Sequence, residues 1–127
     1  MTRSAIPPIA LLLFLSGLAI WNAYDVQAHT DTCVAGIDEA VRAADMGNWP
    51  AAEEALTASY LYWQSRRDHL RTTVSHSVID AADSMYCRAI AFAKTEELTE
   101  FRAETAGLRI HLLHLAENER FLSGNIF

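Results

Sequence analysis

The chain has 127 residues, a net formal charge of −6, and 51% hydrophobic residues. This length accommodates one small domain, and the low content of Gly and Pro excludes collagen-like and loop-built folds. The acidic balance argues against a nucleic-acid partner, because phosphate binding requires a dense cationic surface.

An apolar segment lies near the N-terminus. No charged residue occurs from Ser4 to Tyr24, and residues 5–24 supply the roughly 20 apolar residues that a helix needs to cross a hydrocarbon core about 30 Å thick. Trp21 near its end is an amphipathic aromatic residue of the kind that favours the headgroup layer. Arg3 precedes the segment and acidic residues follow it. The positive-inside rule therefore predicts a single-pass protein of the cell membrane with a cytoplasmic N-terminus and an extracytoplasmic body.

A cleaved signal peptide is the alternative interpretation of this segment. Val26-Gln27-Ala28 has the small-x-small character of a cleavage site, although the approach to it from Asn22 is long and bulky. We expect an uncleaved anchor over residues 1–28. In either case, residues 29–127 are expected to form an exported domain.

Behind the anchor, apolar residues recur at the spacing of packed helices. The expected buried faces consist of Val34, Ile37, Val41 and Ala44; Trp49, Ala52, Leu56, Ser59 or Tyr60, Trp63 and Leu70; Val78 or Ile79, Ala82, Met85 or Tyr86, Ala89 or Ile90, and Ala93; and Leu98, Phe101, Thr105, Leu108, Leu112 and Leu115. No segment shows sustained two-residue alternation, so no sheet is expected. The sequence predicts an all-α protein, an N-terminal transmembrane helix followed by a small antiparallel bundle of about four helices.

Cap residues mark the expected helix ends. Asp31 or Thr32 is expected to cap the first bundle helix, unless that helix continues from the anchor without a break. Gly47-Asn48 is expected to end it, because both residues tolerate the left-handed conformation. Ser75 or Ser77 is the expected cap of the third helix, Ser77 as part of a near capping box.

Two pairs of adjacent acids, Glu53-Glu54 and Glu96-Glu97, are expected in the first turns of the second and the last helix. The helix dipole favours acids there, which explains both pairs without a cation site. Thr95 marks the expected start of the last helix. That helix is expected to end near Asn118, and residues 121–127 then form an apolar tail that packs back on the bundle or docks elsewhere.

Five histidines raise the question of a metal site. His111 and His114 share one face of the last helix and could bind one ion together with His69, His76 or Asp80. The neighbouring leucines, however, place the first two at the flanks of the buried face. We therefore expect boundary histidines and no bound metal or cofactor. His76 and Asp80 are expected to form an imidazole–carboxylate hydrogen bond across the preceding turn.

Catalytic motifs are missing from the sequence. It contains no phosphate-binding glycine loop, EF-hand loop, CxxC pair, HExxH helix or nucleophile elbow, and we expect no enzymatic activity. Cys33 and Cys87 are expected at different heights of the bundle, so we predict two free, mostly buried thiols rather than a disulfide. Trp49 and Trp63 share a helical face and are expected to pack in the core.

A set of residues spread over nearly the whole chain forms a pattern. It comprises Trp21 at the end of the anchor, the turn Gly47-Asn48-Trp49-x-x-Ala52, Trp63, His76 with Asp80, and the terminal Asn125-Ile126-Phe127. The order and spacing of these residues resemble a bacterial family of domains of unknown function, small proteins with one N-terminal transmembrane helix and an extracytoplasmic helical domain. The resemblance implies the topology described above and carries no established activity.

These features predict a membrane-anchored, non-enzymatic interaction module that contacts the bilayer through residues 5–24 and binds or stabilises another membrane or envelope protein. The residues expected to have structural or interaction roles are Trp49, Trp63, His76, Asp80, Phe121 and Phe127. The alternative is an extracytoplasmic metal or ligand sensor that uses histidines of the bundle.

Overall fold

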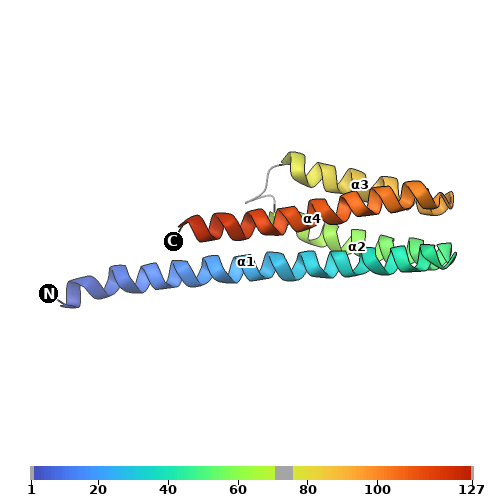
Figure 1. Cartoon of the computed structure of the whole chain (residues 1–127). Helices are drawn as coiled ribbons and strands as arrows, with labels where there is room; N and C mark the ends of the chain where they lie inside the picture. Colours follow the sequence, from blue (N-terminus) through green and yellow to red (C-terminus); the bar gives the residue numbers. More distant parts are fainter. Residues whose placement is uncertain (1, 71–75, 127) are drawn as a thin grey trace.

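The computed structural model describes residues 2–70 and 76–126, with the backbone alone at residues 2–5, 19, 22–26, 69–70 and 119–126. The described chain forms four α-helices: α1 (Thr2–Asp45), α2 (Trp49–Leu70), α3 (His76–Lys94) and α4 (Leu98–Ile126). Successive helices run in opposite directions, and α4 returns to pack against α1 (Figure 1). No strand occurs in these ranges. The predicted all-α antiparallel bundle is confirmed.

Helix α1 is one continuous helix whose N-terminal half projects far beyond the other three (Figure 1). Asp31 and Thr32 lie inside it, so of the two alternatives the unbroken helix is the observed one. Within the described residues, no helix has both the length and the apolar character needed to cross a membrane. The side chains at residues 1–5, 19 and 22–26 of the predicted anchor lie outside the described set.

The turn between α1 and α2 is very short. Gly47 has a φ of 76°, and its N–H donates to the Ala44 carbonyl at 2.9 Å. The N–H of Asn48 donates to the Ala43 carbonyl, also at 2.9 Å, which completes the two-bond pattern of a Schellman motif. The side-chain oxygen of Asn48 then accepts from the N–H of Ala51 at 3.2 Å. Asn48 therefore closes α1 and caps α2, and the predicted helix end at Gly47-Asn48 is confirmed.

The turn between α3 and α4 has the same geometry without a glycine. Glu96 occupies the left-handed position with a φ of 57°, and the N–H of Glu97 donates to the Phe92 carbonyl at 3.0 Å. Thr95 does not cap α4: its hydroxyl lies 2.7 Å from the Glu97 carboxylate and within reach of carbonyls at the end of α3. Helix α4 consequently begins at Leu98, three residues later than Thr95 suggested.

The expected positions of the acid pairs are wrong in detail. Helix α2 begins at Trp49 and has no acid in its first turn, so Glu53-Glu54 lie in the second turn, beyond most of the dipole effect. Glu53 instead lies 3.9 Å from the ammonium of Lys94 on α3. The pair Glu96-Glu97 precedes α4 rather than lying in its first turn.

Two further boundaries differ from the prediction. Helix α3 begins at His76, so Ser77 lies inside the helix and is not its cap; residue 75, the other predicted cap, lies outside the described residues. Helix α4 does not end near Asn118 but continues to Ile126. Residues 121–126 of the expected apolar tail are therefore part of the helix, and their side chains lie outside the described residues.

The core follows the predicted helical faces closely. Its buried residues are Cys33, Val34, Ile37, Ala40, Ala44, Ala52, Leu56, Trp63, Ile79, Ala82, Tyr86, Ala89, Ala93, Phe101, Leu108, Leu112, Leu115 and Ala116, with Thr30, Ser59 and Thr105 as buried polar members. Val41, expected inside, is half-buried, and the adjacent Ala40 is fully buried. Removal of this apolar surface from water is the main stabilising contribution to such a bundle.

Candidate interaction surfaces

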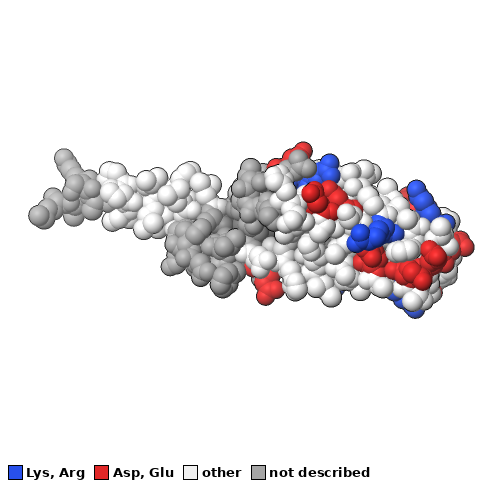
Figure 2. All heavy atoms as spheres, turned by 90° about the horizontal axis from the view of Figure 1, so that it is seen from above, with Lys and Arg blue, Asp and Glu red and all other residues white. Residues whose placement is uncertain are grey.

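The N-terminal half of α1 exposes an apolar surface on every side. Its exposed large hydrophobic residues are Ile6, Ile9, Leu11, Leu12, Leu13, Phe14, Leu15, Leu18, Ile20 and Trp21. Leu13 is 68% exposed and Trp21 64%, and Figure 2 shows the described part of this projection without a charged side chain. Contiguous apolar surface of this extent is rare on monomeric soluble proteins.

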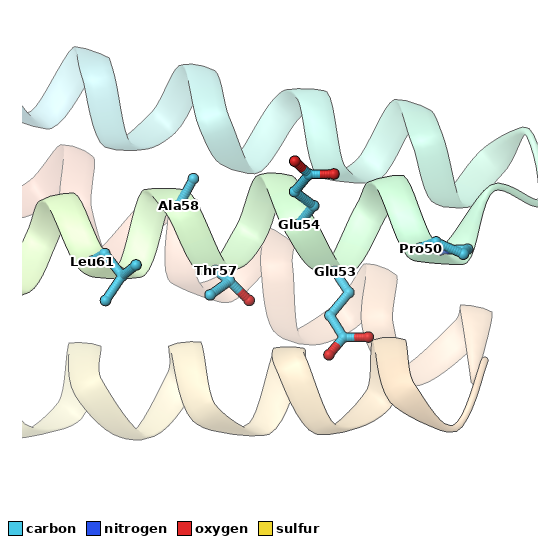
Figure 3. A pocket seen from close by; sticks show the side chains of 6 residues that line it. All are labelled: Pro50, Glu53, Glu54, Thr57, Ala58 and Leu61. Carbon is cyan, nitrogen blue, oxygen red and sulfur yellow. The ribbon is translucent and has the colours of Figure 1, made fainter.

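A shallow groove runs along the outer face of α2 (Figure 3). Its lining residues are Pro50, Glu53, Glu54, Thr57, Ala58 and Leu61. Figure 3 shows the Glu53 side chain directed toward α3 and the Glu54 side chain toward α1. The floor between them consists of small and apolar side chains, and Leu61 is 59% exposed at one end. From residue 57 to residue 65, α2 carries no charge.

A polar cluster lies at the centre of the core, where α1, α2 and α3 meet. The Ser59 hydroxyl donates to the carbonyl oxygen of Cys33 at 2.8 Å. Because that hydroxyl has a single proton, the Tyr86 hydroxyl is the donor in its 2.8 Å bond with Ser59. Burial raises the pKa of Tyr86 above its ordinary value. Burial likewise raises the pKa of the Cys33 thiol to about 11. Both groups are therefore neutral near pH 7.

A second polar contact joins α2 to α3. The indole N–H of Trp63, a buried side chain, donates to one carboxylate oxygen of Asp83 at 2.8 Å. Arg67 donates to the other carboxylate oxygen of Asp83 at 2.9 Å. This arrangement satisfies the only polar atom of Trp63 and fixes its ring in the core. The predicted core position of Trp63 is confirmed.

Trp49, the second tryptophan of the predicted face, is half-buried and packs edge-on against Phe101 with ring centroids 5.6 Å apart. Both cysteines are free, as expected. Cys33 is buried, but Cys87 is exposed, so the prediction of two mostly buried thiols is wrong for Cys87. The Cys87 thiol lies 3.7 Å from the hydroxyl of Tyr60.

The histidines do not converge. A ring nitrogen of His111 lies 2.9 Å from the Val78 carbonyl oxygen, while His114 is exposed. Among the described side chains, no group of three or more His, Cys, Asp or Glu could hold a metal ion. His76 and Asp80 are both exposed. The side chain of His69 lies outside the described residues.

Two more predicted interaction residues cannot be placed on a surface. The side chain of Phe121 and the whole of Phe127 lie outside the described residues. The Ser59–Tyr86–Cys33 cluster, by contrast, was not predicted as a polar site. The only sequence signal for it was Ser59 at a position of the buried face of α2.

The fold and these surfaces together define a class of protein: an antiparallel four-helix bundle carried on a long, apolar N-terminal helix. The chain matches the family described as domain of unknown function (DUF4363) over residues 20–126, and it belongs to this family. The match covers the bundle and begins after most of the apolar projection. Neither the curated proteins nor the solved structures compared with the chain include a match.

Proposed function

We propose that this protein is a membrane-anchored, non-enzymatic helical module that binds or stabilises a neighbouring membrane or envelope protein. The observation that supports the proposal most strongly is the exposed apolar half of α1. It joins without a break the part of α1 that contributes Ile37 and Ala40 to the core. The projection is therefore an integral part of the fold.

The distribution of apolar residues on this projection favours lipid as its surroundings. A helix that packs on one protein surface is apolar along one stripe, whereas a helix in a hydrocarbon core is apolar on all sides. Each exposed Leu, Ile or Phe gains about 1.5–3 kcal/mol when it leaves water. Arg3 before the segment favours an N-terminus on the cytoplasmic side and a bundle on the opposite side.

The polar groups of the core support a non-enzymatic role. Tyr86 and Ser59 are buried, and each has its hydrogen-bond partner inside the protein. Burial raises the pKa of Cys33 and that of Tyr86, whereas an activated nucleophile requires a lowered pKa. The cluster has the properties of a structural network.

The anchoring step can be tested with matched charge substitutions. Leu13→Arg places a charge in the middle of the exposed apolar half of α1, at a site that is 68% exposed, and Met46→Arg places one at an 84% exposed site at the far end of the bundle. We expect the wild-type protein and Met46→Arg to remain in carbonate-washed membranes at the full-length mass, and Leu13→Arg to be released. Release of the wild-type protein would contradict the uncleaved anchor. A measured mass equal to that of residues 29–127 would contradict it as well.

The binding step can be tested by photo-crosslinking in intact membranes. A photoreactive amino acid at Leu61 on α2 or at Ile110 on α4 samples two exposed apolar positions of the bundle. We expect one of these faces to give a discrete crosslinked protein of defined mass, and the other to give none. If neither face crosslinks to any protein, the bundle has no stable partner and the interaction role is wrong.

A further inference from the structure

We propose that the C-terminal end of α4 docks on the lipid surface beside α1, so that the membrane holds the bundle at two points. This inference rests on the proposed function, because it takes the apolar half of α1 to span the bilayer. It assigns a role to residues 121–126, which continue α4.

The register of α1 and α4 places this end at the height of the anchor. Arg102 pairs with Asp45 at 2.6 Å, and Arg109 pairs with Asp38 at 3.1 Å. The two pairs are seven residues apart on each helix, as expected for antiparallel neighbours. Two further steps of seven residues bring residue 123 opposite residue 24, where the predicted membrane segment ends. Helix α4 continues to Ile126 and therefore reaches the height of Trp21.

The direction of the Arg102 and Arg109 side chains also places the end of α4 at the height of the anchor. Side chains of a helix lean toward its N-terminus, so Arg102 and Arg109 reach toward the far end of the bundle to meet their partners. The backbone of α4 consequently lies closer to the anchor than the ion pairs alone indicate. The last turn of α4 is then level with residues inside the segment 5–24.

Neither α2 nor α3 covers this end of α4. His111 contacts the carbonyl of Val78, which lies two residues after the start of α3. Helix α4 continues for fifteen residues beyond His111. Figure 1 shows α4 running past the ends of α2 and α3, with α1 as its only neighbour among the described helices.

The composition of this end suits a lipid surface. Arg120 is the last charged side chain, and the seven residues that follow include Phe121, Leu122 and Ile126. An uncharged helix end with aromatic and aliphatic residues is poorly hydrated in water but well accommodated between headgroups and acyl chains. We therefore commit to lipid, rather than to a second protein, as the contact of this segment.

The test measures the depth of single spin labels on the full-length protein in phosphatidylcholine–phosphatidylglycerol vesicles. Cys87→Ala removes the exposed thiol, and Cys33 is buried. Labels are then placed one at a time through Leu122→Cys, Leu13→Cys and Met46→Cys. Accessibility to oxygen, which partitions into lipid, is compared with accessibility to a water-soluble nickel chelate.

We expect the label at residue 122 to retain oxygen accessibility and to lose nickel accessibility relative to the label at residue 46. Nickel accessibility equal to that at residue 46, with residue 13 in hydrocarbon, overturns this inference and leaves the anchor intact. Low accessibility to both reagents means that the segment packs on α1, and it also overturns the inference. A water-accessible label at residue 13 overturns the anchor itself. If the labelled Leu122→Cys protein does not fold, Ser123→Cys provides the same readout on the same turn.

Discussion

Among the described residues, the left-handed backbone conformation occurs at Gly47 and at Glu96. Glycine adopts this conformation without steric cost, whereas any other L-residue pays about 1–2 kcal/mol. Both positions end a helix with the same hydrogen-bond pattern, and both are exposed. Substitutions at these two positions therefore change the free energy of unfolding mainly through the backbone conformation.

We predict that Glu96→Gly stabilises the protein by about 0.5–1 kcal/mol, because the relief of strain exceeds the added entropy of the unfolded chain. The reverse change, Gly47→Ala, should cost a similar net amount of about 0.5–1 kcal/mol, since nothing lies within 4 Å of the added Cβ and only the backbone resists it. Unfolding midpoints from circular dichroism in detergent measure both. A lower midpoint for Glu96→Gly would contradict the prediction.

Two aspartates on α3 should differ sharply in their contribution to stability. Asp83 accepts the indole proton of buried Trp63 and pairs with Arg67, whereas Asp80 is exposed. Asp83→Ala leaves the indole N–H without its acceptor and should cost about 1–3 kcal/mol. Asp80→Ala should change the unfolding free energy by less than about 0.5 kcal/mol. Equal losses, measured by urea denaturation, would mean that the Trp63–Asp83 bond does not contribute.

At the scale of whole helices, the α1–α2 interface depends on one small residue. A Cβ atom added to Gly36 would lie 2.9 Å from the Cβ of Ser59, closer than side chains tolerate. The contact lies beside the Ser59–Cys33 hydrogen bond, so the absence of a side chain at Gly36 lets the two backbones approach closely enough for that bond to form.

Gly36→Ala should therefore destabilise the protein by a net amount of about 1–2 kcal/mol, because overpacking outweighs the gain in helix propensity. Gly107→Ala is the matched control: this glycine lies in α4 with nothing within 4 Å, and the same change there should stabilise the protein by up to about 1 kcal/mol. Thermal unfolding of the two variants tests the difference in sign. Stabilisation by both substitutions would show that the interface relaxes freely.

The helices themselves were largely predictable from the sequence. Residues such as Ile37, Leu56 and Leu112 recur at the 3.6-residue period, and all three are fully buried. The boundaries were less predictable, because a hydroxyl near a helix end has several possible partners. Thr95 bonds at the end of α3 instead of opening α4, and Ser77 lies inside α3.

The candidate surfaces were only partly predictable. The apolar half of α1 follows directly from the composition of its sequence. The central polar cluster could not be predicted in this way. It requires Cys33, Ser59 and Tyr86 to meet from three helices, whereas the periodicity of apolar residues describes each helix alone. The solvent exposure of Cys87, by contrast, agrees with the periodicity of its own helix, because Tyr86, its neighbour in the sequence, occupies the buried position.

At the scale of the whole molecule, the central cluster predicts how stability depends on pH. Burial raises the pKa of Cys33 from about 9 to about 11, and burial raises that of Tyr86 as well. The folded state thus holds these protons more tightly than the unfolded chain. The corresponding stability is fully present below pH 9 and is lost as the pH rises from 9 through 11.

We therefore expect the unfolding midpoint to fall between pH 8 and pH 10.5. Cys33→Ala should show a smaller fall than the wild-type protein, because it removes one of the groups whose ionisation opposes folding, the others being Tyr86 and Tyr60. Burial and the neighbouring Cys87 raise the pKa of Tyr60, so Cys87→Ala, which removes the exposed thiol, should show a fall closer to that of the wild-type protein than Cys33→Ala does. Identical pH profiles for all three proteins would mean that Cys33 is not held neutral by the fold.

The unbroken course of α1 also has a mechanical consequence. A continuous helix resists bending and twisting over its whole length, whereas a flexible linker would absorb both. A rotation or tilt imposed near Ile9 is therefore transmitted to Ile37 and to the side chains packed around it. The bundle therefore rotates or tilts together with the N-terminal half of α1, and its orientation depends on any rotation imposed on that half.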